Sequence, residues 1–321
     1  MPDLLDTQLL HALQLDGRAP FSLIAEVLGV SDQTIARRYN RLHEAGHLRV
    51  RGLSDVERLR DTRWIVRVQC RPNAAAAAAD ALARRPDTSW ISLTSGGTEI
   101  VCVVRTASGE RDNRLLLQTL PRNRFVEAMT AHCVLHTFFG DPAGLINKLG
   151  FLTPSQVAQL QWQPDATADG EPVSLSDLDR KLLALLQDDG RATFAELAVA
   201  AGASQTTVRR RMAELRENGT LYFDLDFDQA LLDLHVRAMV WLSVAPSQLV
   251  AVGEALAGHP ETAYVAATTG ASNLYASVVC ADTSALYTYL TTRIAGLSGI
   301  ERVETVPIVR SVKRGGLLGP P

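Results

Sequence analysis

The sequence predicts an α+β fold built as a tandem repeat, in which one unit occurs twice along the chain. Three observations lead to this prediction. Residues 5–48 align without a gap onto residues 178–221, and 21 of the 44 aligned positions are identical. In each copy, apolar residues first recur with a helical period and then alternate as they do in strands. The later parts of the two copies also correspond, at an offset of 174 residues instead of 173, so the repeat covers most of the chain.

Each copy begins with three short helices. In the first copy, a row of leucines marks the first helix, which ends at Asp16-Gly17, and the second helix ends at Gly29. Ser31 caps a third helix that runs to Gly46. Residues 174–221 repeat the pattern. A glycine-ended turn before the third helix is typical of a helix-turn-helix.

The second part of each copy reads as β-α-β-β-α-β, the split βαβ or ferredoxin-like arrangement. In the first copy we expect strands at 64–70, 89–94, 100–105 and 125–139, with helices at 72–85 and 109–120. In the second copy we expect strands at 236–244, 264–268, 274–280 and 303–312, with helices at 247–257 and 284–294.

The predicted domains follow from these patterns. They are a helix-turn-helix domain at 1–58, a βαββαβ domain at 59–140, a linker at 141–173, a second helix-turn-helix domain at 174–230, a second βαββαβ domain at 231–314 and a flexible tail at 315–321. Within the linker, Thr153-Pro154-Ser155-Gln156 has the form of a capping box and predicts a short helix. Residues 164–172 lack apolar side chains and are expected to be flexible.

Composition restricts the class of protein. The 321 residues carry a net charge of −3, so any contact with DNA must come from local arginine clusters. No apolar run is long enough to cross a bilayer and the first residues do not form a secretory signal, which predicts a cytoplasmic protein. The four cysteines are far apart, which argues against a zinc site and disulfides. We expect no cofactor and no metal, because no glycine-rich phosphate loop, nucleophile elbow or metal-ligand cluster occurs.

The third helix carries the pattern of a DNA-recognition helix. Ile35, Tyr39 and Leu42 fall on one face and can pack inward, whereas arginines gather on a neighbouring face. Arginine donates to guanine edges and phosphates, and an α-helix fits the major groove. The alternative is a solvated charged face. The DNA-binding residues predicted are Ser31, Gln33, Thr34, Arg37, Arg38 and Arg41, the wing residues Arg49 and Arg51, and in the second copy Ser204, Thr206, Thr207, Arg209, Arg210 and Arg211.

The second copy differs from the first in its charges. Glu214 replaces Arg41, and Tyr222 and Asp224 replace the wing arginines. Together with Asp226 and Asp228, Asp224 would repel phosphate. We therefore expect the first helix-turn-helix to dominate DNA affinity.

The order of helix-turn-helix and βαββαβ, with "LD…LL..L..DGR" followed by "S..T..RR…L…G.L", resembles the Lrp/AsnC family of transcription regulators. The resemblance implies a winged helix-turn-helix domain that binds double-stranded DNA, and a ferredoxin-like domain that binds a small effector, usually an amino acid. It also implies self-association through the βαββαβ domains. Members of the family typically have one unit per chain, so this sequence looks like a single-chain version of the family's dimer.

The resemblance places the effector near a turn whose motif reads T-G-x-x-D. The matching stretches are Ser95-Gly96-Gly97-Thr98-Glu99 and Thr269-Gly270-Ala271-Ser272-Asn273. The effector-binding residues implied are Gly96, Thr98, Glu99, Gly270, Ser272 and Asn273. Backbone N–H groups at the turn could take a carboxylate, and Glu99 an ammonium. The alternative is a plain hairpin turn whose glycine supplies a positive φ.

Two other functions stay open. Proteins resembling this family, some with two fused units, act as sirohaem decarboxylases and are thought to use histidine and arginine. His132 and His136 lie four residues apart in the last strand of the first copy and are expected to face the same side. The arginines of both third helices argue against this enzyme. A module that senses an effector but has lost DNA binding is the third possibility, and the acidic second wing favours it.

Overall fold

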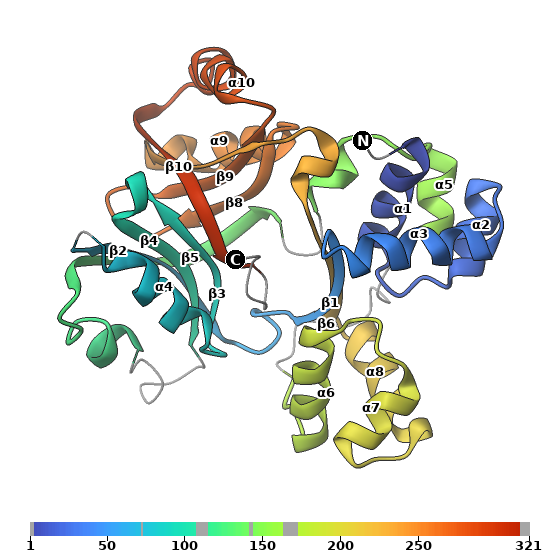
Figure 1. The fold of residues 1–321 in the computed structure, drawn as a ribbon. Helices are drawn as coiled ribbons and strands as arrows, with labels where there is room; N and C mark the ends of the chain where they lie inside the picture. Colours follow the sequence, from blue (N-terminus) through green and yellow to red (C-terminus); the bar gives the residue numbers. More distant parts are fainter. Residues whose placement is uncertain (1–2, 72, 107–114, 141–143, 163–172, 315–321) are drawn as a thin grey trace. The chain divides into compact units, whose positions relative to one another are not determined.

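The computed structural model describes residues 3–71, 73–106, 115–140, 144–162 and 173–314, which form two compact units. The helical unit comprises residues 1–60 and 141–232, and the sheet unit comprises residues 61–140 and 233–321. Each unit therefore takes one part from each copy of the repeat (Figure 1). The predicted flexible segment at 164–172, the tail at 315–321, Pro72 and the first part of the helix expected at 109–120 lie outside the described residues.

The helical unit contains the two predicted sets of three helices. They are α1 (Leu4–Leu15), α2 (Phe21–Leu28) and α3 (Asp32–Glu44) in the first copy, and α6 (Asp177–Asp188), α7 (Phe194–Ala201) and α8 (Gln205–Glu217) in the second. Ser31 and Ser204 accept hydrogen bonds from the backbone amides of Thr34 and Thr207, in the first turns of α3 and α8, and Gly29 and Gly202 end α2 and α7 in the left-handed conformation. The capping-box helix is present as α5 (Pro154–Leu160), after a 3-10 turn at Leu145–Lys148.

Each third helix is followed by a strand at the position of the expected wing, for which the sequence analysis gives no strand range. These strands are β1 (Leu48–Ser54) and β6 (Leu221–Phe227), and they pair antiparallel with one another. Along β6, buried and half-buried side chains alternate strictly. This period of two is visible in the sequence of 221–227, but the helix-turn-helix pattern of 1–58 and its repeat at 174–221 dominates both regions, so the sequence analysis assigns helices there.

One hydrophobic core fills the helical unit and draws on both copies. Leu9 and Leu13 of α1, and their equivalents Leu182 and Leu186 of α6, are fully buried together with residues of both strands. The two helix-turn-helix domains therefore share a core instead of folding as separate modules.

The sheet unit is an eight-stranded closed barrel with the order β10-β3-β4-β2-β5-β8-β9-β7. The first copy supplies β2 (Thr62–Cys70), β3 (Thr88–Thr94), β4 (Glu99–Thr106) and β5 (Val126–Phe139). The second copy supplies β7 (Val236–Val244), β8 (Thr262–Thr268), β9 (Leu274–Cys280) and β10 (Ile300–Lys313). Each copy contributes the four strands of a ferredoxin-like sheet, as predicted.

The long strands β5 and β10 join the two sheets. The first part of β5 pairs with β2, and the part from Val134 onward pairs with β8. In the same way, β10 pairs first with β7 and from Ile308 onward with β3. The two sheets thus exchange the ends of equivalent strands, which closes the barrel.

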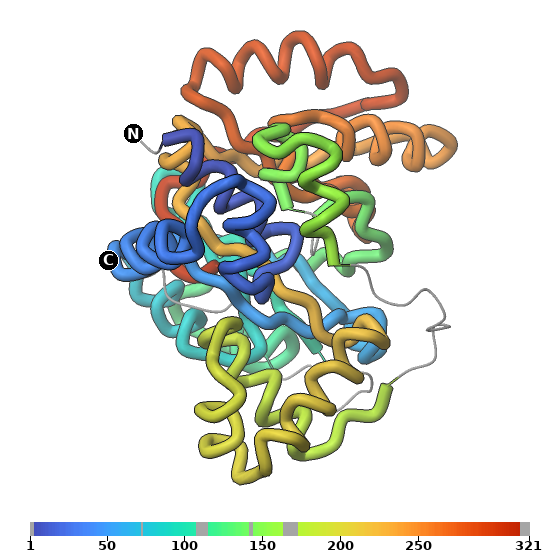
Figure 2. The backbone as a smooth tube through the Cα atoms, turned by 90° about the vertical axis from the view of Figure 1, so that its right-hand side faces the viewer, coloured from blue at the N-terminus to red at the C-terminus, as the bar shows by residue number. Residues whose placement is uncertain are grey.

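Helices cover the outer faces of the two sheets. In the first copy these are α4 (Ala75–Ala83) and a π-helical turn at Leu115–Thr119. In the second copy, α9 (Leu249–Gly258) is joined by α10 (Thr283–Thr288), which continues into the π-helical turn η7 (Tyr289–Ile294) as one coil (Figure 2). Two cores lie under these helices, and a third, around Trp241, lies between the sheets. Among the described residues, no helix is long and apolar enough to span a membrane.

Candidate nucleic-acid interface

The exposed face of α3 carries the polar residues that the sequence analysis assigned to DNA. Ile35, Tyr39 and Leu42 are buried in the core, as expected from their spacing. Ser31, Gln33 and Arg37 are exposed. Thr34 is half-buried, and its hydroxyl and backbone amide both bond to the Ser31 hydroxyl. Within the described residues, the Arg37 side chain makes no hydrogen bond or ion pair. Arg37 is therefore a cation available to a partner.

The other two arginines of α3 are held by carboxylates near the start of the chain. Arg38 donates to Asp6 at 2.8 Å and to Asp3 at 2.6 Å, and only 17% of its side chain is exposed. Arg41 donates to the other oxygen of Asp6 at 2.6 Å but keeps 58% of its side chain exposed. Arg41 can therefore still reach a phosphate, whereas Arg38 lies between α3 and α1.

On α8 the arginines are more strongly neutralised. Arg211 donates to Asp179 at 2.6 and 2.9 Å, and both Arg210 and Arg211 contact Glu214. Arg209 is exposed and its guanidinium lies 4.4 Å from the centre of the Phe194 ring. Ser204 and Thr206 are exposed and Thr207 bonds to Ser204, as in the first copy.

The wing residues differ from the prediction. Arg49 is exposed, but the Arg51 side chain is 2% exposed and donates to the Gln187 carbonyl and, at 3.4 Å, to Asp226. Arg51 is thus enclosed by β6 and α6, and its expected contact with phosphate does not fit this structure. The sequence did not reveal the pairing of β1 with β6, which brings Arg51 against Asp226 and the Gln187 carbonyl of α6.

The aspartates in β6 and directly after it also have partners in the first copy. Asp224 accepts from the Gln14 amide at 3.2 Å, and Asp228 lies 3.2 Å from His47. Asp226 accepts from Arg51, so each of the three aspartates contacts a side chain of the first copy. Their charges are therefore used between the two copies, which reduces the repulsion of phosphate that their presence in the sequence predicted.

A pair of equivalent arginines links the two helix-turn-helix domains. Arg18 donates to the carbonyls of Gly190 and Ala192 at 2.8 and 3.0 Å. Arg191 donates to the carbonyls of Gly17 and Ala19 at 2.6 and 3.2 Å. The arginine of each "DGR" motif thus binds the other copy's motif, as in a two-fold dimer interface. The repeated motif was visible in the sequence, but nothing in one chain's sequence showed that the copies face each other.

The glycine of each motif allows this close approach. A Cβ on Gly17 would lie 2.6 Å from Val50 Cγ1, and a Cβ on Gly190 would lie 2.8 Å from the backbone of Arg51. The Gly190 amide donates to the Val50 carbonyl at 2.8 Å. The arginine latch, as we name the Arg18 and Arg191 contacts, therefore holds the turns directly against the β1–β6 ribbon.

In the sheet unit, the first predicted effector turn has its acidic side chain in use. Glu99 is buried, accepts from Arg67 Nε at 2.7 Å and from the hydroxyls of Thr94 and Ser95 at 3.0 Å each. Arg67 also forms two hydrogen bonds to Glu304 of the second copy. Gly96 and Thr98 are exposed, and a Cβ on Gly96 would meet no atom within 4 Å. This turn is open at its surface but closed around Glu99.

The second predicted turn also has its polar side chain in use. Asn273 accepts from the Val244 amide at 2.9 Å and donates to the Val244 carbonyl at 2.8 Å, so its amide serves the sheet. A Cβ on Gly270 would lie 2.7 Å from His132, and the carbonyl of Ser272 accepts from Thr268. The two turns are therefore not equivalent: residues of β5 fill the space beside the second.

Comparison with protein families finds the same two parts in this chain. The AsnC-type helix-turn-helix domain matches residues 3–43 and again residues 175–216, and the Lrp/AsnC ligand binding domain matches residues 237–318. An uncharacterized HTH-type transcriptional regulator of Pyrococcus horikoshii is 30% identical over 145 residues, which cover 45% of this chain and 91% of that protein. The chain belongs to the Lrp/AsnC family.

A second relative also matches slightly less than half of the chain. An HTH-type transcriptional regulator of Mycobacterium tuberculosis is 31% identical over 143 residues, covering 43% of this chain and 94% of that protein. Each of these relatives is thus similar to about one copy. Among solved structures, the siroheme decarboxylase NirDL covers 97% of this chain and 93% of its own length, with a TM-score of 0.65 and 14% identity. At this identity the likeness shows the fold alone, and it includes both copies.

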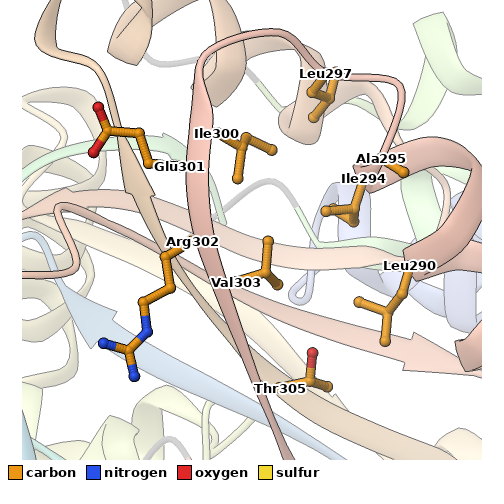
Figure 3. Close-up of a pocket in the computed structure, with 9 residues that line it drawn as sticks. All are labelled: Leu290, Ile294, Ala295, Leu297, Ile300, Glu301, Arg302, Val303 and Thr305. Atoms are coloured by element: carbon orange, nitrogen blue, oxygen red, sulfur yellow. The ribbon is translucent and has the colours of Figure 1, made fainter.

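Two further features of this Lrp/AsnC chain lie in the sheet unit. His132 and His136 do not share a face as expected, because a bulge interrupts β5 between Val134 and His136. His132 packs against Trp241 between the sheets, whereas His136 is exposed. A pocket of about 430 Å³ lies between η7 and the start of β10, lined mainly by apolar side chains, with Glu301 and Arg302 directed away from them (Figure 3). In the described part of the chain, no group of three potential metal ligands gathers.

Proposed function

We propose that this chain is a sequence-specific DNA-binding transcription regulator that carries both of its recognition helices on one polypeptide. The observation that carries the proposal is the exposed face of α3, where Gln33, Arg37 and Arg41 stand free of the core. The arginine latch supports it, because two recognition helices fixed in one unit can contact two half-sites about one helical turn, or a multiple of it, apart. This function places the protein in the cytoplasm.

We further propose that the first recognition helix supplies most of the affinity. Arg37 has no side-chain partner among the described residues, whereas its equivalent Arg210 is bonded to Glu214. A phosphate must compete with that carboxylate for Arg210. The second helix then contributes through Thr206 and Arg209, and the operator is an asymmetric version of a two-fold site.

Fluorescence anisotropy with the genomic fragments that the purified protein enriches tests this proposal. Arg37→Ala should weaken binding by about tenfold, since one good phosphate or base contact contributes on the order of 1–3 kcal/mol. Arg210→Ala should weaken it less than threefold. Arg180→Ala, which removes an exposed arginine of α6, is the matched control for loss of one positive charge. Equal losses at Arg37 and Arg210 would contradict the asymmetry, and no enrichment of any fragment would contradict sequence-specific binding.

We also propose that the sheet unit responds to a small effector such as an amino acid, at the turn Ser95–Glu99. The free space beside Gly96, where an added Cβ would meet no atom within 4 Å, favours this turn over the one at Gly270, where an added Cβ would lie 2.7 Å from His132. Glu99 contributes by holding Arg67 and the turn hydroxyls, not as a free acid. The midpoint of thermal unfolding, measured in the presence of each amino acid in turn, should rise for one of them. Thr98→Val should reduce that rise, whereas Ser272→Ala should leave it unchanged. The converse pattern would move the site to the second turn.

The full-length likeness to a siroheme decarboxylase supports one alternative function, tetrapyrrole chemistry. The separation of His132 and His136 by the β5 bulge disfavours it, because the two histidines do not converge on one ligand. Titration with iron-uroporphyrin, followed by visible absorbance, distinguishes the functions. A shifted absorbance band that is lost in His132→Ala would favour the enzyme, whereas an unperturbed spectrum would favour the regulator.

A further inference from the structure

Arg38 and Arg211 occupy equivalent positions in the two third helices and make the same contact. Arg38 donates to Asp6 of α1 at 2.8 Å, and Arg211 donates to Asp179 of α6 at 2.6 and 2.9 Å. Each pair therefore joins the third helix of a copy to the first turn of its first helix. Because the same pair is formed twice, it is a property of the fold and not of one side chain's position.

The buried carboxylates keep these two arginine side chains at the surface of the first helix and away from solvent. Asp6 is 2% exposed and Asp179 is fully buried, and a buried carboxylate is costly unless a cation or hydrogen-bond donors contact it. Burial alone would raise the pKa of Asp179, but hydrogen bonds from Arg211 and Ser176 outweigh it and hold the pKa below its usual value. The Arg38 side chain bonds to the buried Asp6. Arg37, its neighbour in sequence, is exposed and has no such partner among the described residues.

We infer that Arg38 and Arg211 are positioning residues that set the angle of each recognition helix, and that Arg37 beside Arg38 is the residue that meets DNA. The pairs Asp6–Arg38 and Asp179–Arg211 thus divide the arginine cluster of each third helix into an inner residue and outer residues. The DNA-contacting half of this inference rests on the proposed function, whereas the positioning half does not.

Salt dependence separates the two roles on DNA. A side chain that neutralises one phosphate changes the slope of log affinity against log salt concentration by about one unit, whereas a residue that only orients the helix leaves that slope unchanged. Substitution of a residue needed only for folding would change neither the affinity nor the slope, provided that the affinity is calculated from the concentration of folded protein. The three roles therefore give three different results.

The experiment measures anisotropy with an enriched DNA fragment at several salt concentrations, using the full chain. Arg38→Gln should weaken binding by about tenfold at an unchanged slope, and Arg37→Gln should lower the slope by about one unit. A lowered slope for Arg38→Gln would assign it to phosphate and overturn the inference. Unchanged affinity and slope for Arg38→Gln would reduce it to a folding residue and also overturn it.

A second measurement needs no DNA and keeps the inference testable if the chain binds none. Hydrogen–deuterium exchange in peptides covering Asp32–Glu44 should become about tenfold faster in Arg38→Gln and in Asp6→Asn. The double variant should exchange at the same rate as the single variants, because both substitutions remove the same contact. Arg37→Gln is the matched control and should leave these rates unchanged. If Arg38→Gln also leaves them unchanged, Arg38 does not position α3. Absence of DNA binding by the unmodified chain would refute the proposed function but not this result.

Discussion

Truncation of Arg18 tests whether the arginine latch holds the two copies together. Arg18→Ala removes the two hydrogen bonds to the carbonyls of Gly190 and Ala192, which lie on the other copy. It also removes the guanidinium from beside the Phe194 ring, whose centre lies 5.2 Å away. The variant leaves α1 and its leucines in place, so any effect on the second copy must pass through the latch.

The expected magnitude follows from opposing contributions. Two hydrogen bonds from a charged donor contribute about 3–6 kcal/mol, and the ring contact adds about 0.5–1 kcal/mol. Burial, together with repulsion from Arg191 and Arg216, lowers the pKa of Arg18 well below its usual value, to about 10. That shift corresponds to a cost of roughly 3 kcal/mol at about 1.4 kcal/mol per pKa unit. We therefore expect Arg18→Ala to lower the free energy of unfolding of the helical unit by about 1–4 kcal/mol.

Hydrogen–deuterium exchange gives the result copy by copy. In Arg18→Ala, peptides from α6 and α7 of the second copy should exchange faster, even though the substitution lies in the first. Arg191→Ala should have the converse effect on α1 and α2. Arg180→Ala, an exposed arginine on α6, should change neither. Faster exchange confined to the copy that carries the substitution would refute the view that these arginines join the copies.

Three other changes have defined outcomes. Gly190→Ala places a Cβ 2.8 Å from the Arg51 backbone and should lower the thermal unfolding midpoint by several degrees. Gly258→Ala, whose Cβ would meet no atom within 4 Å, should leave the midpoint unchanged. Equal midpoints for the two variants would contradict the close approach at Gly190. Since the pKa of Asp179 is lowered in the folded chain, its stabilisation is complete at neutral pH and is lost as the pH falls below about 4 through the lower folded value. Asp179→Asn should therefore flatten the fall of urea midpoint between about pH 4 and pH 2. Arg67→Met leaves the buried Glu99 without a cation and should cost about 3–5 kcal/mol in urea unfolding; a loss under about 1 kcal/mol would mean that the Thr94 and Ser95 hydroxyls suffice.

Much of the fold could be predicted from the sequence, because its elements have local signals. Ser31 and Gly29 mark the ends of helices, and the strands at 236–244 and 274–280 agree with β7 and β9. The exchange of strand ends that closes the barrel could not be predicted. It depends on β5 and β10 being long enough to serve two sheets, and alternation along a strand does not reveal its partner.

Part of the candidate site could likewise be predicted from the sequence and part could not. Helical spacing correctly placed Ile35 inside and Arg37 outside, but it put Arg38 on the same outer face. Whether an arginine meets solvent or a carboxylate depends on residues 32 positions away, such as Asp6, which the period of one helix does not contain. Arg51 was misplaced because its strand was not recognised, and a strand's partner decides which side chains it covers.

The register of the β1–β6 ribbon has a consequence for how such a chain can change in evolution. Arg51 stands opposite Asp224, and these are equivalent positions of the two copies. In a dimer of identical chains the residue at this point faces its own twin, so a buried arginine there would meet a second arginine. Fusion of the copies removes that restriction, because the two sides of the axis can mutate independently. The chain keeps the geometry of a symmetric dimer while placing opposite charges across its centre, an arrangement that otherwise requires two different genes.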